Sequence, residues 1–220
     1  MYKSIFNVIA VAAVSSFLYI GCGDNSAGID DDTKIPKDST ENPSVPAPTK
    51  TTFQDNRDGH SYRKVAIGSQ VWMSENLYYD AEGSVCYNNS ADSCAKYGRL
   101  YTWAAAEKAC PTGWHLPSDA EWTVLVKYVG GAFTAGGKLK STSGWYGNSG
   151  TDEYGFSALP GGVGGGDGSF ELGGVFGYWW SSSAIAGEIA VVRYMNGAND
   201  EMGSSYFCAY CETSVRCVED

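Results

Sequence analysis

Histidine and positive charge are scarce in this chain. Its 220 residues include two histidines and 15 lysines and arginines against 25 acidic residues, for a formal net charge of −10. Two histidines cannot build a histidine-rich zinc site, and the lack of any basic cluster excludes nucleic acid as a partner. No serine stands in the pattern of a nucleophile elbow. The sequence therefore argues against these enzyme classes and indicates no cofactor and no metal.

Charged residues of both signs are also few, at 18% of the chain, whereas hydrophobic residues make up 43%. That much apolar material is enough for one buried core, and the length suits one domain with a tail. The 28 glycines and the 14% of aromatic residues are typical of a fold with many turns and short strands. A helix bundle is therefore not expected.

The first 22 residues have the pattern of an export signal. Lys3 supplies a positive start, and the apolar run at residues 5–20 is short for a membrane span. The run ends Leu-Tyr-Ile-Gly-Cys at residues 18–22, which resembles a bacterial lipobox with Tyr19 in place of the usual leucine. The resemblance implies cleavage before Cys22 and attachment of lipid to its sulfur. An ordinary secretory signal peptide is the alternative.

Residues 23–52 are expected to form a disordered linker. They contain three consecutive aspartates, four prolines and almost no large apolar residue, so they cannot bury a core. A loose coil of about 30 residues spans roughly 30 Å. Such a tether would hold a folded domain, expected at residues 53–220, clear of a membrane surface.

Besides Cys22 the chain has an even number of cysteines, which in an exported protein predicts disulfides. The six are Cys86, Cys94, Cys110, Cys208, Cys211 and Cys217. The first two bracket a short polar loop, and a local bridge between them is expected. The remaining pairings stay open at this point.

A helix start is the clearest local signal in the chain. Ser118 and Glu121 form a capping box, and apolar residues at helical spacing follow it as far as Val129. Two glycines then end this helix. A second helix is expected at residues 100–110, directly before Pro111. His115, between the two helices, is expected to have a structural hydrogen-bonding role.

Strand signals surround this pair of helices. Residues 62–67 and 70–73 alternate in polarity and are separated by Gly-Ser, which predicts a hairpin. Further strands are expected at 154–159, 178–182, 189–195 and 214–218. Helices together with short strands indicate a mixed α+β domain that is largely antiparallel.

Several ordered blocks of sequence resemble one known family. One of them reads Trp-Met-Ser-Glu-Asn-Leu at residues 72–77, and another reads Tyr-Gly-Phe-Ser-Ala-Leu-Pro-Gly-Gly at residues 154–162. The full set comprises residues 58–62, 67–77, 97–106, 110–122, 154–162, 177–182 and 214–218. Together they resemble the Fibrobacter succinogenes major paralogous domain, a module of exported bacterial lipoproteins.

That module is similar in turn to the C-type-lectin-like fold of formylglycine-generating enzymes. The resemblance implies two helices packed on a small twisted antiparallel sheet with long loops. It also implies a disulfide between Cys110 and Cys217, which by elimination leaves Cys208 to pair with Cys211. The family provides no catalytic residues to transfer.

The spacing Cys208-Ala-Tyr-Cys211 has two interpretations. Two free thiols so close together could bind copper(I) or act in redox chemistry, and the approach to them resembles a site of the formylglycine-generating enzymes. The alternative function is therefore a copper-dependent cysteine oxidase. A structural disulfide that ties a hairpin is the simpler interpretation.

Exposed aromatic residues are the remaining candidates for ligand binding. Trp145, Tyr146, Tyr178 and Trp179 could stack on sugar rings, although neighbouring residues of a strand point to opposite faces, so some must be buried. The group Asn199, Asp200 and Glu201 offers only a weak calcium signal, and the glycine-rich run 161–168 lacks the following helix of a phosphate loop.

We therefore expect a non-catalytic, lipid-anchored recognition or display domain of the cell envelope. The membrane would be contacted through the N-terminal lipid, at the outer membrane or cell surface. The expected ligand is an extracellular polysaccharide or protein.

Overall fold

The computed structural model describes residues 49–186 and 188–220. The predicted signal peptide, its acceptor Cys22 and linker residues 23–48 lie outside this range. The first strand already begins at Lys50, so the folded part starts slightly before the boundary at residue 53 expected from the sequence.

Thirteen strands in the described residues form two main sheets and a small third one. They are β1 Lys50–Gln54, β2 Ser61–Ile67, β3 Gln70–Met73, β4 Ser84–Val85, β5 Leu100–Tyr101, β6 Trp114–His115, β7 Val163–Gly164, β8 Phe170–Glu171, β9 Phe176–Ala186, β10 Ile189–Asn196, β11 Met202–Cys208, β12 Thr213–Ser214 and β13 Val218–Glu219. The first sheet has the order β1-β2-β3-β13-β6, and the second has the order β11-β10-β9-β12-β5-β4. All pairs are antiparallel except β9 with β12.

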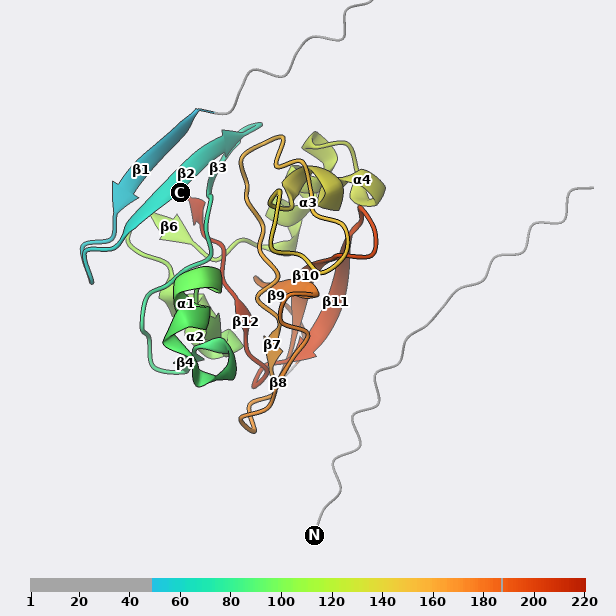
Figure 1. Ribbon diagram of the computed structural model, residues 1–220. Coiled ribbons are helices and arrows are strands. Elements are labelled where there is room, and N and C mark those ends of the chain that lie inside the picture. The colour runs from blue at the N-terminus through green and yellow to red at the C-terminus, as the bar shows by residue number, and fades with distance from the viewer. Residues whose placement is uncertain (1–48, 187) are drawn as a thin grey trace, which may run out of the picture. The chain divides into compact units, whose positions relative to one another are not determined.

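The described residues form four α-helices and one short 3₁₀ helix, whereas the sequence analysis expected two helices. They are η1 Tyr87–Asn89, α1 Ala91–Tyr97, α2 Trp103–Ala109, α3 Asp119–Tyr128 and α4 Ala132–Leu139. None of these helices is long and apolar enough to cross a membrane. The mixed composition and the antiparallel pairing confirm an α+β domain (Figure 1).

The C-terminal segment joins the two main sheets. Strand β12 lies between β9 and β5 in the second sheet, and β13 lies between β3 and β6 in the first (Figure 1, red). The sequence pattern predicted one continuous strand at 214–218, but the chain leaves one sheet and enters the other between Ser214 and Val218. Residues 215–217 are buried in this crossing.

Three disulfides are present in the described residues, as the even number of cysteines predicted. Cys86 is bonded to Cys94, Cys110 to Cys217, and Cys208 to Cys211. The second of these ties the end of α2 to the crossing segment, across a sequence separation of 107 residues. It closes the longest loop, so it restricts the unfolded chain most.

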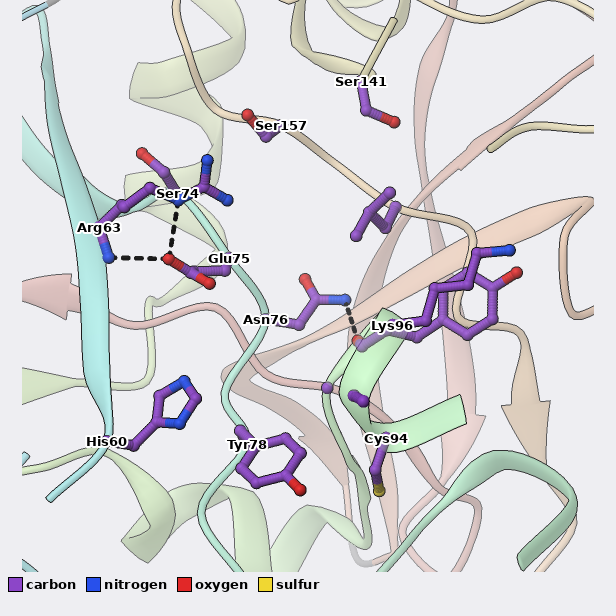
Figure 2. A pocket seen from close by; sticks show the side chains of 14 residues that line it. His60, Arg63, Ser74, Glu75, Asn76, Tyr78, Cys94, Lys96, Ser141 and Ser157 are labelled. Atoms are coloured by element: carbon purple, nitrogen blue, oxygen red, sulfur yellow. Dashed lines mark hydrogen bonds and ion pairs between the residues drawn. The ribbon is translucent and has the colours of Figure 1, made fainter. Parts of the chain in front are cut away.

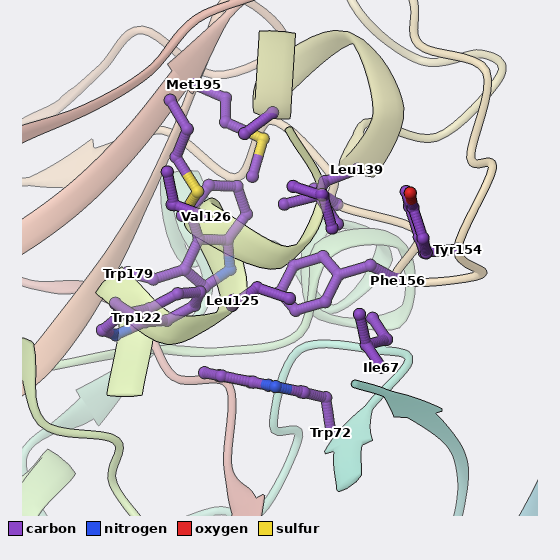
Figure 3. Packing of buried hydrophobic residues seen from close by; sticks show 14 of the residues in the cluster. Ile67, Trp72, Trp122, Leu125, Val126, Leu139, Tyr154, Phe156, Trp179 and Met195 are labelled. Carbon is purple, nitrogen blue, oxygen red and sulfur yellow. The ribbon is translucent and has the colours of Figure 1, made fainter. Parts of the chain in front are cut away.

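Two clusters of buried apolar residues fill the domain. In the first, Trp72 of β3 lies 4.7 Å from Trp122 of α3 between ring centroids, and both rings contact Phe156 edge-on (Figure 3). Met195 of β10 completes this side of the cluster. The helix face predicted from the sequence is thus the face that packs against both sheets.

The predicted capping box is present at the start of α3. The Ser118 side chain accepts the N–H of Glu121, and the Glu121 carboxylate accepts the N–H of Ser118. The same carboxylate contacts Nε2 of His115 at 2.7 Å, while Nδ1 lies 2.6 Å from Oδ1 of Asp220. Burial alone would lower the pKa of His115, but the two carboxylates outweigh it and raise that pKa. His115 therefore ties the helix start to the C-terminus, which is a structural role.

Some expected elements are absent or differ. Residues 154–159 form turns with one isolated bridge at Ala158 instead of a strand, because Ser157 has a positive φ and its N–H donates to Asp152. The helix expected at 100–110 begins only at Trp103, since the side chain of Thr102 caps it. Helices α1 and α4 lacked a clear sequence signal.

The long disulfide should dominate covalent stabilisation. A Cys110→Ala and Cys217→Ala double variant is expected to lose about 4–5 kcal/mol of stability, or about 10–15 °C in Tm, by the chain-entropy relation. Thermal unfolding followed by circular dichroism measures this. The matched control removes Cys86 and Cys94, whose separation is 8 residues, and should lose only about 2–3 kcal/mol. Equal losses in both variants would contradict the argument.

The His115 contacts predict a pH-dependent stability. The pKa of His115 is raised on folding, so its contribution is complete below the ordinary value of 6.5 and is lost as the pH rises through the folded value. Burial alone would raise the pKa of Glu121, but hydrogen bonds from Ser118 and His115 lower it, so its contribution is present above 4.5 and lost in acid.

We expect His115→Gln to lower Tm by only about 2 °C near pH 5.5, because solvent screens these partly exposed groups. The loss of Tm should be smaller near pH 8.5, because the imidazole loses its positive charge as the pH rises. Differential scanning calorimetry at both pH values measures the difference. A loss of equal size at both would mean that the ring acts through packing alone.

Candidate functional site

The structure does not bring the predicted aromatic ligand-binding residues together. Trp145 and Trp179 are buried in the first core cluster, and Tyr178 is buried in the second. Both tryptophan N–H groups are used internally: Trp145 donates to Ala158 O, and Trp179 donates to Asn76 Oδ1. For these three residues the prediction of an exposed stacking surface is wrong, because long-range packing covers them.

Tyr146 alone of this set is exposed, at 81% of its surface. Its backbone is fixed, since its N–H donates to Gly174 O at 2.7 Å. A single exposed ring makes no platform for a sugar chain.

The two other sequence candidates are already engaged within the chain. Cys208 and Cys211 are bonded to each other, so in this state neither supplies a thiolate to copper. At the weak calcium candidate, the ammonium of fully buried Lys140 donates to Asn199 O and lies 3.9 Å from Asp200 Oδ1. The chain thus provides its own cation there.

A different feature stands out, a pocket of about 550 Å³ that lies within the usual size range of small-ligand sites. Four parts of the chain form it: the start of β2, the segment after β3, the end of α1, and the long loop between α4 and β7 (Figure 2). Its lining residues are His60, Arg63, Ser74, Glu75, Asn76, Tyr78, Cys94, Ala95, Lys96, Tyr97, Gly98, Ser141, Ser157 and Leu159.

Backbone hydrogen bonds hold the segment after β3 in the pocket wall. The N–H of Ser74 donates to Arg63 O at 2.8 Å, and the N–H of Leu77 donates to Val215 O at 2.9 Å. On the other side, Gly98 at the end of α1 has φ +75°, and a Cβ there would lie 2.8 Å from Leu77 O. Only glycine allows so close an approach. The end of α1 therefore packs directly against the segment after β3, and this contact fixes the wall.

Asn76 connects the pocket wall to the core. Its amide nitrogen donates to Tyr97 O at 2.8 Å (Figure 2) and to Ser214 Oγ at 3.3 Å. Its amide oxygen accepts the Trp179 N–H at 2.9 Å and the Arg216 guanidinium at 2.7 Å. Every donor and acceptor of the amide is thereby used, and Asn76 is fixed as a structural member of the wall.

Arg216 lies directly behind the pocket and is fully buried. Besides Asn76, its guanidinium donates to the carbonyl oxygens of Met73 and Phe156, and it lies 4.3 Å from the centre of the Phe156 ring. Burial lowers its pKa to about 9, an effect that the charges of Glu75 and Asp152 oppose. Arg216 therefore keeps its positive charge at neutral pH.

Glu75 and Arg63 form an ion pair at the pocket rim. Glu75 Oε1 accepts both the backbone N–H and the Nε–H of Arg63, at 2.8 and 2.9 Å (Figure 2). Burial alone would raise the pKa of Glu75, but these hydrogen bonds and the charge of Arg63 lower it. The carboxylate is thus held ionised and occupied, which makes it a poor general acid or base.

The rest of the lining offers flat rings and one lysine. The His60 ring stacks on Tyr78, with centroids 5.1 Å apart and planes 20° apart, and Tyr78 is 36% exposed. Tyr97 and Lys96 stand opposite, with the ammonium 4.7 Å from the ring centre. Such rings give an apolar face, and the polar groups around them give directional hydrogen bonds.

The described residues bring no paired catalytic groups together in the pocket. Within residues 49–186 and 188–220, no hydrogen bond joins the His60 ring to a pocket serine or carboxylate, so no nucleophile and base are paired. In the same residues no group of three or more His, Cys, Asp or Glu side chains is placed to hold a metal ion.

The sequence does not predict this pocket, although several of its lining residues belong to recognised sequence blocks. His60, Ser74, Asn76, Tyr97 and Ser157 all belong to the sequence blocks on which the family resemblance rests. The available signal was that the polar residues Ser74 and Asn76 stand next to apolar residues within one block. Their assembly into one site depends on contacts that span up to 140 residues, which no local pattern shows.

Comparison with known proteins agrees with the resemblance. A family model described as the Fibrobacter succinogenes major domain matches residues 65–219, which is more than half of the chain. No curated protein matches, and neither does any solved structure. The matched range includes Ser74 to Leu159 of the pocket lining and Arg216 behind it. The chain therefore belongs to the Fibrobacter succinogenes major domain family.

Proposed function

We propose that the protein is a non-catalytic recognition domain, lipid-anchored at the outer membrane or cell surface, that binds a saccharide in the pocket between β2, the segment after β3 and the end of α1. The observation that carries the proposal is the combination of the partly exposed Tyr78 and His60 rings with a polar lining in a cavity of about 550 Å³. Saccharides present an apolar C–H face and a rim of hydroxyls, which match these two surfaces.

The rigidity of the site supports the same proposal. Asn76 and Gly98 fix the wall before any ligand arrives, and a preformed site loses little entropy on binding. The occupied Glu75 carboxylate and the bonded Cys208–Cys211 pair favour binding over catalysis. A copper-dependent oxidase would need these two sulfurs as free thiols, so we do not propose it.

The resemblance to a C-type-lectin-like fold is part of this proposal. It is supported by the successive helices α2 and α3 and by the disulfide from the end of α2 to the last segment. Four α-helices and two sheets go beyond the simpler arrangement that the resemblance implied.

The anchoring part of the proposal depends on Cys22. We expect a Cys22→Ser variant to lose the lipid, because a serine hydroxyl does not replace the acceptor sulfur. Mass spectrometry of the N-terminal peptide measures this as the loss of the lipid mass. Ser26→Ala is the control and should keep the lipid. A Cys22→Ser protein whose N-terminal peptide still carries the lipid would contradict attachment at this residue.

The binding part is tested by two matched tyrosines. Tyr78→Ala should weaken binding to responsive oligosaccharides by about tenfold, since an aromatic contact contributes about 1 kcal/mol or more. Tyr146→Ala removes a tyrosine that is more exposed than Tyr78 and lies outside the pocket, and it should leave affinity unchanged. Isothermal titration calorimetry against a panel of neutral and acidic plant and microbial oligosaccharides measures this.

A flat response of the unmodified chain across that panel would overturn the saccharide proposal and leave a protein ligand as the next candidate. If Tyr146→Ala weakened binding while Tyr78→Ala did not, the binding site would lie on the loop of Tyr146 and the pocket would be the wrong location.

A further inference from the structure

We propose that strand β11 pairs with β11 of a second copy of this chain, so that the protein forms a two-fold symmetric dimer with one continuous sheet. The inference goes beyond the proposed function, because the pocket lining contains no residue of β9, β10 or β11. It is carried by the unprotected edge of β11 and by the order of large and small side chains along that strand.

Strand β11 is an open edge of the second sheet. Its register with β10 is continuous from Met202 to Cys208, and no strand lies on its other side among the described residues. In the same part of the chain, no backbone group at positions 203–207 forms a hydrogen bond outside the pairing with β10. Figure 1 accordingly shows β11 beside β10 at the outside of the domain. Its outward-facing N–H and C=O groups are therefore available to another strand.

The other three edges of the two main sheets are protected in ways that natural proteins use against edge-to-edge pairing. Strands β4 and β6 have two residues each, and β1 carries Lys50. Strand β11 has seven residues, Met-Gly-Ser-Ser-Tyr-Phe-Cys, without a charge, a proline or a bulge against β10. The missing protection indicates that this edge is used in an interface.

The sequence of β11 fits an antiparallel copy of itself. Gly203 and Ser204 are small, Tyr206 and Phe207 are large, and Ser205 lies between the two pairs. When the two-fold axis passes through Ser205, Tyr206 lies opposite the partner's Ser204, and Phe207 lies opposite the partner's Gly203. Each large side chain then has a small one across from it, and the two Ser205 hydroxyls meet at the axis.

Both large side chains have surface to bury in this pairing. Tyr206 is 60% exposed, and Phe207 is partly exposed. The Tyr194 ring occupies the space that a Cβ of Gly203 would take, so the partner's Phe207 would meet an aromatic ring there. No charged side chain of β11 enters the contact, so the pairing brings no like charges of this strand together. Burial of the aromatic rings is the main gain expected from it.

The register is tested by single cysteine substitutions in the full chain under mild oxidation. Directly opposite residues of an antiparallel pair have Cα atoms about 4.5–5.5 Å apart, which a disulfide can span. Ser205→Cys should therefore give a covalent dimer, which mass spectrometry identifies by the peptide that links position 205 of both copies. Ser204→Cys is the matched control. Its side chain is more exposed, but its Cα atoms would lie about 8 Å apart in this register, so the linked dimer should be lost.

The association itself is tested by sedimentation velocity of the full chain from about 1 µM to about 1 mM, the range of weak complexes. We expect a reversible shift from monomer to dimer, since one short strand makes a small interface. Tyr206→Lys places a charge on the edge at an exposed site and should weaken the dimer by about tenfold, as for the loss of two cross-strand pairs. Tyr146→Lys, the same change at a loop tyrosine that is 81% exposed, should leave the dimer unchanged.

Every other result overturns the inference. A chain that stays monomeric over the whole range would leave this edge to water or to a strand of another protein. A dimer that Tyr206→Lys leaves intact would mean that the copies meet through another surface. A Ser204→Cys variant that links as well as Ser205→Cys would mean another register or random collision. None of these results affects the saccharide proposal, because β11 lies outside the pocket lining.

Discussion

The crossing of the C-terminal segment between the two sheets is the constraint on which the rest of the structure depends. Within seven residues the chain pairs with β9 and β5 and then with β3 and β6. Neither sheet is complete without this segment, so neither can form independently of the chain's last residues. Cys110 fixes the crossing covalently through Cys217. The helices therefore pack on two sheets that are complete only when the first strands of the domain and its C-terminal segment have both paired.

The same crossing connects directly to the pocket wall. Its own carbonyl oxygens at Val215 and Cys217 accept the backbone N–H groups of Leu77 and Met73. Arg216 lies in the crossing and donates to the carbonyl oxygens of two neighbouring segments, Met73 O and Phe156 O. Asn76 accepts from Arg216 on one side and donates to Tyr97 O on the other. Arg216 therefore stabilises the crossing and also contacts Asn76 of the pocket wall, so its positive charge lies directly behind that wall.

The sequence predicts those parts of the fold that depend on near neighbours. The capping box at Ser118 and the hairpin at residues 62–73 are present in the structure, because their signals lie within a few residues. The break in the last strand, the burial of Trp145 and Trp179 and the pocket itself depend on segments far apart in the chain. Helix α4 was missed because it contains two glycines, yet Gly136 is needed there, since a Cβ would lie 2.9 Å from Asp200 O. Composition therefore gave the class of fold, and tertiary contacts decide the site.

The net charge of this chain does not determine the charge around its pocket. The excess of acidic residues excludes a broad basic surface, but most carboxylates of the described residues are exposed, where salt screens them beyond about 10 Å. A group inside the pocket experiences mainly the nearest charges, which include Lys96 in the lining and Arg216 behind it. Lys96 is exposed, whereas Arg216 is fully buried, and the charges of Glu75 and Asp152 act on it. An acidic chain can therefore contain a buried cation next to a cavity, provided that the fold itself requires it at that place.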